Sequence, residues 1–109
     1  PVWLSPEQAR IIPITDDQHS YAREIEARLK QAGVRASADL GSDRMNAKIR
    51  AAQQMQVPYM LVVGGQEMEN GTVAPRLRSG ARMEALSVSD FIARIQAEIR
   101  NRVQAPELQ

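Results

Sequence analysis

The strongest constraint on the fold is a run of five apolar residues in the middle of the chain, Tyr59 to Val63, which lies between Pro58 and the pair Gly64-Gly65. Five residues are too few for a helix of ordinary length, and a continuous apolar run is typical of a strand that is buried on both faces. The glycines allow the chain to turn sharply where the strand ends. The run therefore predicts the central strand of a largely parallel sheet.

The segments on either side of this run alternate between strand and helix patterns. Further strands are predicted at residues 8–14, 34–40, 72–78 and 81–86, and helices at residues 15–32, 44–55 and 87–103. The first strand, helix and second strand form a βαβ unit, whose handedness rule implies parallel strands. The last two strands form a hairpin around Ser79-Gly80, and Pro75, which has no N–H to donate, marks an edge or a bulge. The predicted fold is a three-layer α/β/α domain with a mixed five-stranded sheet and about three helices.

The totals limit what the domain can do. A chain of 109 residues is one domain, and the absence of cysteine excludes disulfides and thiolate chemistry. Fourteen basic and thirteen acidic residues nearly cancel, so only a local patch could bind nucleic acid. Twelve of the basic residues are arginines, which suits phosphates and base edges but also follows from GC-rich coding. No run has membrane-spanning length and no signal peptide is evident, so we expect a cytoplasmic protein.

The sequence does not favour catalysis. His19 is the only histidine, so a metal site lacks a second ligand and a Ser/His/Asp set lacks a base. Gly64-Gly65 is not a phosphate loop, because no Gly-Lys-Ser/Thr follows and no helix is predicted behind it. Asp16-Asp17 could bind a cation, but with Thr15 we interpret it as the cap of the first helix. No catalytic and no metal-binding residues are therefore predicted.

Binding residues are easier to identify. Glu67 follows the central strand, and ligands of α/β folds bind beyond the carboxyl ends of the strands. Basic residues fall in two clusters, one on the second helix (Arg44, Lys48 and Arg50) and one on the hairpin (Arg76, Arg78 and Arg82). On the helix, the basic residues are predicted to point outward, whereas Met45, Ile49 and Ala52 point inward. We expect the hairpin to lie beside the loop around Glu67. The arginines are either a solvated strand face or an RNA surface with arginines on phosphates and a carboxylate on a guanine edge.

Several motifs of the chain are shared with one known family. They are P-V-W-L-S-P-E-Q-A-R-I-I-P-I-T-D (1–16), D-L-x-x-D/E-R/K (39–44), K-I-R (48–50), V-P-Y-M-L-V-V-G (57–64), E-M-E-N-G-T-V (67–73) and R-L-R-S-G (76–80). On these motifs the chain resembles the C-terminal anticodon-binding domain of bacterial threonyl-tRNA synthetase, a class II aminoacyl-tRNA synthetase. The resemblance extends from Pro1 to about Arg102.

The resemblance implies a function and a set of site residues. Glu67 and Arg76 would contact the second and third anticodon bases, a guanine and a uracil. Ser42 stands where the family has an asparagine that helps to bind these bases, and Arg50 and Arg78 complete the anticodon-binding set. Arg44 and Lys48 are expected to contact phosphates. Residues 1–7 would be the remnant of a linker from a missing catalytic domain, 8–103 the anticodon-binding domain and 104–109 a flexible tail. The partners would be the anticodon stem-loop of tRNA(Thr) and the catalytic domain of the same chain. No cofactor is expected in this domain, because ATP-dependent threonylation and zinc binding belong to the missing domains of the enzyme. The full enzyme is expected to be a homodimer.

The chain also departs from the family pattern. Gly41, Ser42 and Ala47 replace an arginine, an asparagine and an aromatic residue, and Pro75 lies beside Arg76. These departures leave an alternative open, a synthetase-derived protein-interaction or regulatory domain that no longer reads tRNA. A flavodoxin-like nucleotide-binding domain would share the strand order, but Thr15-Asp16-Asp17 replaces its phosphate loop with acidic residues.

Overall fold

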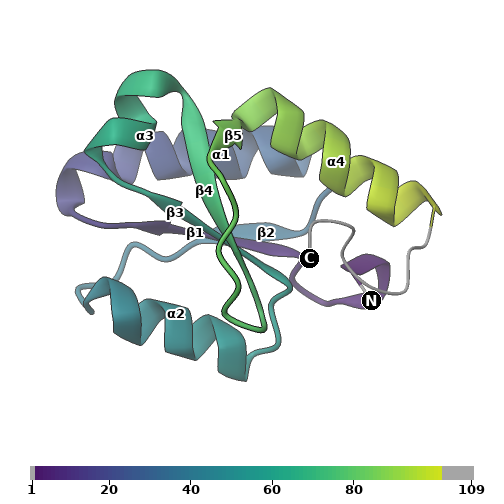
Figure 1. Ribbon diagram of the computed structural model, residues 1–109, viewed down its shortest axis with the longest axis horizontal. Helices are drawn as coiled ribbons and strands as arrows, with labels where there is room; N and C mark the ends of the chain where they lie inside the picture. The colour runs from purple at the N-terminus through teal and green to yellow at the C-terminus, as the bar shows by residue number, and fades with distance from the viewer. Residues whose placement is uncertain (1, 102–109) are drawn as a thin grey trace.

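The computed structural model describes residues 2–101, which form one sheet with helices on both of its faces (Figure 1). The elements in chain order are the 3₁₀ turn η1 (Val2–Leu4), β1 (Ala9–Pro13), the 3₁₀ turn η2 (Asp16–Gln18), α1 (His19–Gln31), β2 (Ala36–Ala38), α2 (Met45–Gln54), β3 (Tyr59–Val63), α3 (Gly65–Asn70), β4 (Thr72–Leu77), β5 (Leu86–Ser87) and α4 (Val88–Asn101). The strand order is β2-β1-β3-β4-β5. β1, β2 and β3 are parallel, and β4 and β5 are antiparallel additions.

The apolar run at residues 59–63 is the central strand, β3, as the sequence predicts. All five of its residues are buried. Alternate side chains face opposite layers, since Tyr59 and Leu61 pack with α1 and α4, whereas Met60 and Val62 pack with α2. Figure 1 shows α1 and α4 together on one face of the sheet and α2 on the other. The three-layer α/β/α fold is therefore confirmed. None of the helices within residues 2–101 is long and apolar enough to cross a membrane.

Residues 2–7, most of the segment expected to be a linker, begin with a residue that packs into the core. Val2 is buried in the core beside α4. Gln8 is also buried, and its side-chain amide donates to the carbonyl of Val2 while its side-chain oxygen accepts the N–H of Arg35. The expected tail, 104–109, and the predicted end of the last helix at Val103 lie outside the described residues.

A fourth, short helix was not predicted. α3 begins directly after Gly64, so the expectation that no helix opens behind the glycine pair is wrong. The carboxylate of Glu67 accepts the N–H of Gly64 at 2.7 Å and so satisfies one of the free amides of the first helical turn. Gly71 ends the helix with φ of 71°, a left-handed conformation that glycine adopts without strain.

The prediction of a second hairpin strand at residues 81–86 is largely wrong, because only Leu86 of this range belongs to a strand, β5. Only Arg82 forms a bridge, with Arg76, and regular pairing resumes at β5, where Leu86 pairs with Val73. The return segment therefore has one residue more than β4 between these two pairs, which defines a bulge. Pro75 explains the interruption, because its carbonyl accepts the N–H of Met83 at 2.9 Å but it has no N–H to donate back. The bulge at Pro75 is the second of the two outcomes expected from the sequence.

A charged group beside the amino end of β1 makes the stability of the domain depend on pH. Arg10 donates two hydrogen bonds to the carboxylate of Glu7, at 2.7 and 2.9 Å, and the hydroxyl of Ser37 donates a third at 2.8 Å. Burial raises the pKa of Glu7, but these hydrogen bonds and the charge of Arg10 outweigh burial, so the pKa lies below its ordinary value of 4.5. The folded state therefore favours the ionised form of Glu7.

Replacing Glu7 by glutamine is expected to lower the free energy of unfolding at pH 7. Because the folded-state pKa is lowered, this stabilisation is present above the unfolded-state value and is lost as the pH falls through the folded-state pKa. The difference between wild type and Glu7→Gln should therefore shrink on acidification below pH 4.5, as measured by urea unfolding at a series of pH values. Glu24→Gln, at an exposed position of α1, is the control. A difference that stays constant with pH would contradict the assignment.

Candidate nucleic-acid interface

The loops that follow β1, β2 and β3 meet at one edge of the sheet, because these strands are parallel. Two predicted site residues lie there. Glu67 is in the first turn of α3, and Ser42 is exposed in the loop between β2 and α2. Glu67 is partly exposed, and within residues 2–101 no cation lies within ion-pair distance of its carboxylate. Its hydrogen bond to Gly64 fixes the carboxylate at this edge while leaving lone pairs on both oxygens.

One flank of α2 faces the turn that follows β4. The side-chain amide of Gln53 donates to the carbonyl of Arg78 at 3.3 Å, which places Gln53 on that side of the helix. Arg50 and Asn46 precede Gln53 by three and seven residues, so all three lie on one stripe of the helix. Arg50 and Asn46 are exposed. The predicted site residue Arg50 therefore points toward the β4 side of the domain.

The face of β4 that borders this flank carries Arg76. Arg76 pairs with Met60, and Ala74 pairs with Val62, so both face the α2 layer. Thr72, Ala74 and Arg76 are partly exposed, whereas the alternate residues of β4 are buried against α1 and α4. We call the surface formed by Asn46, Arg50 and Gln53 on one side and Thr72, Ala74 and Arg76 on the other the α2–β4 track.

The arginines around this track have no carboxylate partners. Within residues 2–101, no Asp or Glu oxygen lies within 4.0 Å of the guanidinium groups of Arg44, Arg50, Arg76, Arg78 or Arg82. Burial and the neighbouring Arg82 lower the pKa of Arg76. Arginine nevertheless stays protonated in proteins, so Arg76 and Arg82 remain two like charges side by side. An anionic ligand at the track would relieve their repulsion.

The two residues expected to read bases lie at opposite ends of the track. Arg76 is level with Met60, at the beginning of β3, whereas Glu67 follows the end of β3 at Gly64. Four residues of strand separate these levels, about 13 Å. α3 lies beside the start of β4, as the sequence predicts (Figure 1), whereas Arg76 lies toward the other end of β4. One base cannot contact both residues, whereas successive nucleotides of an extended strand can.

Lys48 differs most from the sequence prediction. It was predicted to point outward, but only 4% of it is exposed, and its ammonium group donates to the carbonyl of Asp39 at 2.9 Å. Its aliphatic stem lies between α2 and β2, as long basic side chains often do. Lys48 thus holds the loop that carries Ser42, and its neighbour Arg44 at the beginning of α2 is the exposed cation.

The turn after β1 caps the helix as predicted, but through Thr15, which is the N-cap of η2 and forms a capping box with Gln18. The backbone N–H and the hydroxyl of Thr15 both donate to the side-chain oxygen of Gln18 at 2.9 Å, whereas Asp16 and Asp17 are exposed. His19 begins α1, and its ring lies 3.4 Å from the carboxylate of Asp16. Within residues 2–101 no three His, Cys, Asp or Glu side chains gather where a metal could bind.

Sequence reasoning did not single out Asn46 or Gln53. The signal was available, because these residues and Arg50 have the spacing of one helical stripe. What was missing was the direction of that stripe, which depends on how α2 packs on the sheet.

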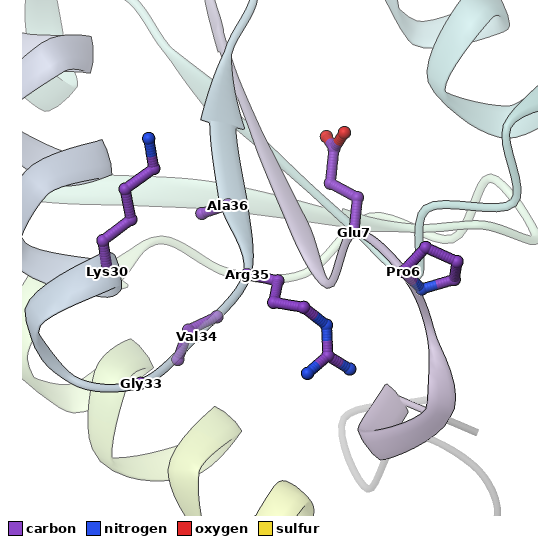
Figure 2. A pocket seen from close by; sticks show the side chains of 7 residues that line it. All are labelled: Pro6, Glu7, Lys30, Gly33, Val34, Arg35 and Ala36. Atoms are coloured by element: carbon purple, nitrogen blue, oxygen red, sulfur yellow. The ribbon is translucent and has the colours of Figure 1, made fainter.

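A cavity of about 530 Å³ is formed by a different set of residues (Figure 2). It is lined by Pro6, Glu7, Lys30, Gly33, Val34, Arg35 and Ala36, at the turn between α1 and β2. The guanidinium of Arg35 is bound by the carbonyls of Trp3 and Ser5. None of the predicted site residues lines this cavity, so it is a separate feature of the surface.

Comparison with known proteins gives one consistent result. The anticodon binding domain family matches residues 8–98. The chain is 47% identical over 102 residues to a threonine–tRNA ligase of Desulforamulus reducens, covering 94% of this chain and 16% of that enzyme. It is 49% identical over 98 residues to the threonine–tRNA ligase of Syntrophotalea carbinolica, covering 90% of this chain and 15% of the relative. The chain thus spans about one sixth of the length of the curated relatives that it matches.

A solved structure agrees with this result. The crystal structure of the RNA binding domain of threonyl-tRNA synthetase from Cryptosporidium parvum superposes with a TM-score of 0.84 at 33% identity, covering 89% of this chain and 24% of that chain. The family match, the sequence relatives and the solved structure therefore all concern the same domain of an aminoacyl-tRNA synthetase.

Proposed function

Because this chain belongs to the anticodon binding domain family, we propose that it is the part of a threonine–tRNA ligase that binds the anticodon loop of tRNA(Thr). The observation that carries the proposal is the α2–β4 track, where arginines without carboxylate partners line an exposed surface that ends near the fixed carboxylate of Glu67. Single-stranded RNA is commonly recognised by contacts to its phosphates and to the edges of splayed bases. The track offers groups for both.

The proposed roles follow from the chemistry of each side chain. Glu67 accepts hydrogen bonds from the N1–H and N2 amine of the guanine at the second anticodon position, and Arg76 donates to a carbonyl of the uracil at the third. Arg50 and Arg78 contact phosphates or base edges along the track. Ser42 and Arg44 contact the RNA backbone at the edge of the sheet where the parallel strands end. Lys48 holds the loop that carries Ser42 in place there.

The remainder of the enzyme belongs to the same proposal. The domain is non-catalytic and supports the ATP-dependent threonylation of tRNA(Thr) by a catalytic domain elsewhere in the polypeptide. ATP and zinc are bound by those other domains, the whole enzyme is a homodimer, and it acts in the cytoplasm, where its tRNA is used. The share of the relatives that this chain covers supports a division of labour of this kind.

Binding to altered tRNAs tests the proposal. The Kd of the chain would be measured for tRNA(Thr) transcripts with the native anticodon and with the second or third base replaced, each at two salt concentrations. A preference for the native anticodon that persists at the higher salt is expected, because base contacts release fewer counterions than phosphate contacts do. Indifference to the anticodon would contradict the proposal and favour a protein-interaction or regulatory domain.

Replacing Arg44 by glutamine is expected to weaken binding of all transcripts alike. If Arg44 contacts one phosphate, the slope of log K against log salt should fall by about 0.7 for a single strand or about 0.9 for a duplex stem. Arg94→Gln, at an exposed position of α4 on the opposite face of the sheet, is the matched control. An unchanged slope for Arg44→Gln would exclude a phosphate contact at this residue.

A further inference from the structure

Two arginines lie directly opposite each other on the hairpin. Arg76 of β4 and Arg82 form an isolated antiparallel bridge. The pair is framed by two backbone hydrogen bonds of 2.9 Å, from the N–H of Leu77 to the carbonyl of Ala81 and from the N–H of Met83 to the carbonyl of Pro75. Bonds in these positions define a non-hydrogen-bonded pair, the kind whose side chains come closest, with Cα atoms about 4.5 Å apart. The backbone therefore holds the two side chains next to each other.

Both arginines face the same layer of the domain. Residues directly opposite each other on neighbouring strands share a face, and Arg76 faces the α2 layer with Met60. Met83, which follows Arg82, packs instead against the core formed with α1 and α4, as the alternation of a strand requires. Arg82 is exposed and Arg76 is partly exposed. Arg82 thus extends the α2–β4 track beyond β4.

The charges of this pair are not balanced by the protein. Within residues 2–101 neither guanidinium forms an ion pair with a carboxylate, and this includes Glu84, two residues after Arg82. Like charges directly opposite each other destabilise a sheet. Burial and the charge of Arg82 lower the pKa of Arg76, which agrees with an unfavourable potential at this position. The pair is therefore suited to an anion that two guanidinium groups can share.

The surroundings of the pair favour a phosphate group of RNA as this anion. A guanidinium fork donates two parallel hydrogen bonds to a phosphate. Arg50 and Arg78 on the same track also lack carboxylate partners among the described residues, so the cations are spread along a surface, which suits a chain of phosphates. Since Arg76 is the proposed contact of the third anticodon base, a phosphate at Arg82 is one that flanks this base.

We propose that Arg82 binds a backbone phosphate that flanks the third anticodon nucleotide, while Arg76, directly opposite, contacts the base of that nucleotide. This inference rests on the proposed function and adds one phosphate-binding residue to it. The bound phosphate relieves the repulsion between the two arginines, which destabilises the free domain. Arg82 therefore contributes affinity and positions the nucleotide, but it does not read the sequence.

The inference is tested with Arg82→Gln and the anticodon stem-loop of tRNA(Thr). The Kd is expected to rise about tenfold, because a hydrogen bond between charged groups is lost, and to rise alike for every anticodon sequence. The slope of log K against log salt should fall by about 0.7. Without RNA, the urea midpoint should rise at low salt, since the repulsion is removed, and this gain should shrink at high salt. Arg94→Gln, at an exposed position of α4 on the opposite face, is the control and should leave the Kd and the slope unchanged.

Neutralising single phosphates locates the contact. Stem-loops would carry an uncharged methylphosphonate link on one side or the other of the third anticodon nucleotide. At one of the two links, the difference in Kd between wild type and Arg82→Gln is expected to disappear, because the two changes remove the same interaction. A difference that persists at both links would overturn the phosphate contact.

The outcomes separate this inference from the proposed function. If the wild type prefers the native anticodon and Arg82→Gln binds the stem-loop as tightly as the wild type, the role of Arg82 is wrong and the proposed function stands. Weaker binding with a lower urea midpoint and an unchanged salt slope would make Arg82 a structural residue and also overturn the inference. A wild type that ignores the anticodon sequence would overturn the proposed function and the inference together.

Discussion

Replacing Glu67 by alanine is expected to remove most of the preference for guanine at the second anticodon position. A hydrogen bond to a charged group contributes about 1.5–3 kcal/mol, so discrimination should fall by roughly 10- to 100-fold. Binding of transcripts that already lack this guanine should change little. The measurement is the ratio of Kd values for the two transcripts, in wild type and variant at one salt concentration.

Glu67 also accepts the N–H of Gly64, so the variant loses a helix cap as well. Loss of a cap costs about 0.5–2 kcal/mol of stability, which thermal unfolding would detect separately from binding. Glu67→Gln provides the matched control, because an amide oxygen can still accept from Gly64 but its NH₂ group repels a guanine donor. Discrimination kept by Glu67→Gln and lost by Glu67→Ala would mean that the cap, and not base contact, is the function of this residue.

Replacing Leu61 by alanine is expected to have the largest effect on stability. Leu61 is fully buried at the centre of β3, between β1 and β4, and faces the core formed with α1 and α4. Removing a buried leucine side chain costs about 2–5 kcal/mol, because transfer free energy is lost and a cavity remains. Urea unfolding monitored by circular dichroism would measure the loss.

The matched control for this prediction is Leu4→Ala. Leu4 is the same residue type but 60% exposed, so the substitution should change the free energy of unfolding by no more than about 0.5 kcal/mol. If Leu61→Ala were as mild as Leu4→Ala, the central position of β3 in the core would be wrong.

Much of the fold could be predicted because it depends on local patterns. The apolar run at residues 59–63 can be satisfied only by burial on two faces, and helical spacing predicted α1, α2 and α4. The short helix α3 was missed because six residues are too few to show a helical period. Its first turn is capped by a side-chain hydrogen bond, from the N–H of Gly64 to the carboxylate of Glu67. Such short elements are stabilised by particular contacts rather than by a repeating pattern.

The candidate site was predicted only in part. Residue type indicated Glu67 and the arginines as binding groups, but the separation of Glu67 from Arg76 follows from the register between β3 and β4. Register depends on side-chain packing across two strands and is not contained in either strand alone.

The sequence by itself determined the layers of this protein, its central strand and the set of charged residues available for binding. Only the tertiary structure decided which of those charges face solvent. Lys48 and Arg50 are two residues apart on one helix and look equivalent in sequence, yet one is buried on a carbonyl beside β2 and the other is exposed on the β4 side. Residues two apart lie on nearly opposite sides of a helix. The rotation of α2 on the sheet therefore assigns one to the scaffold and the other to the surface.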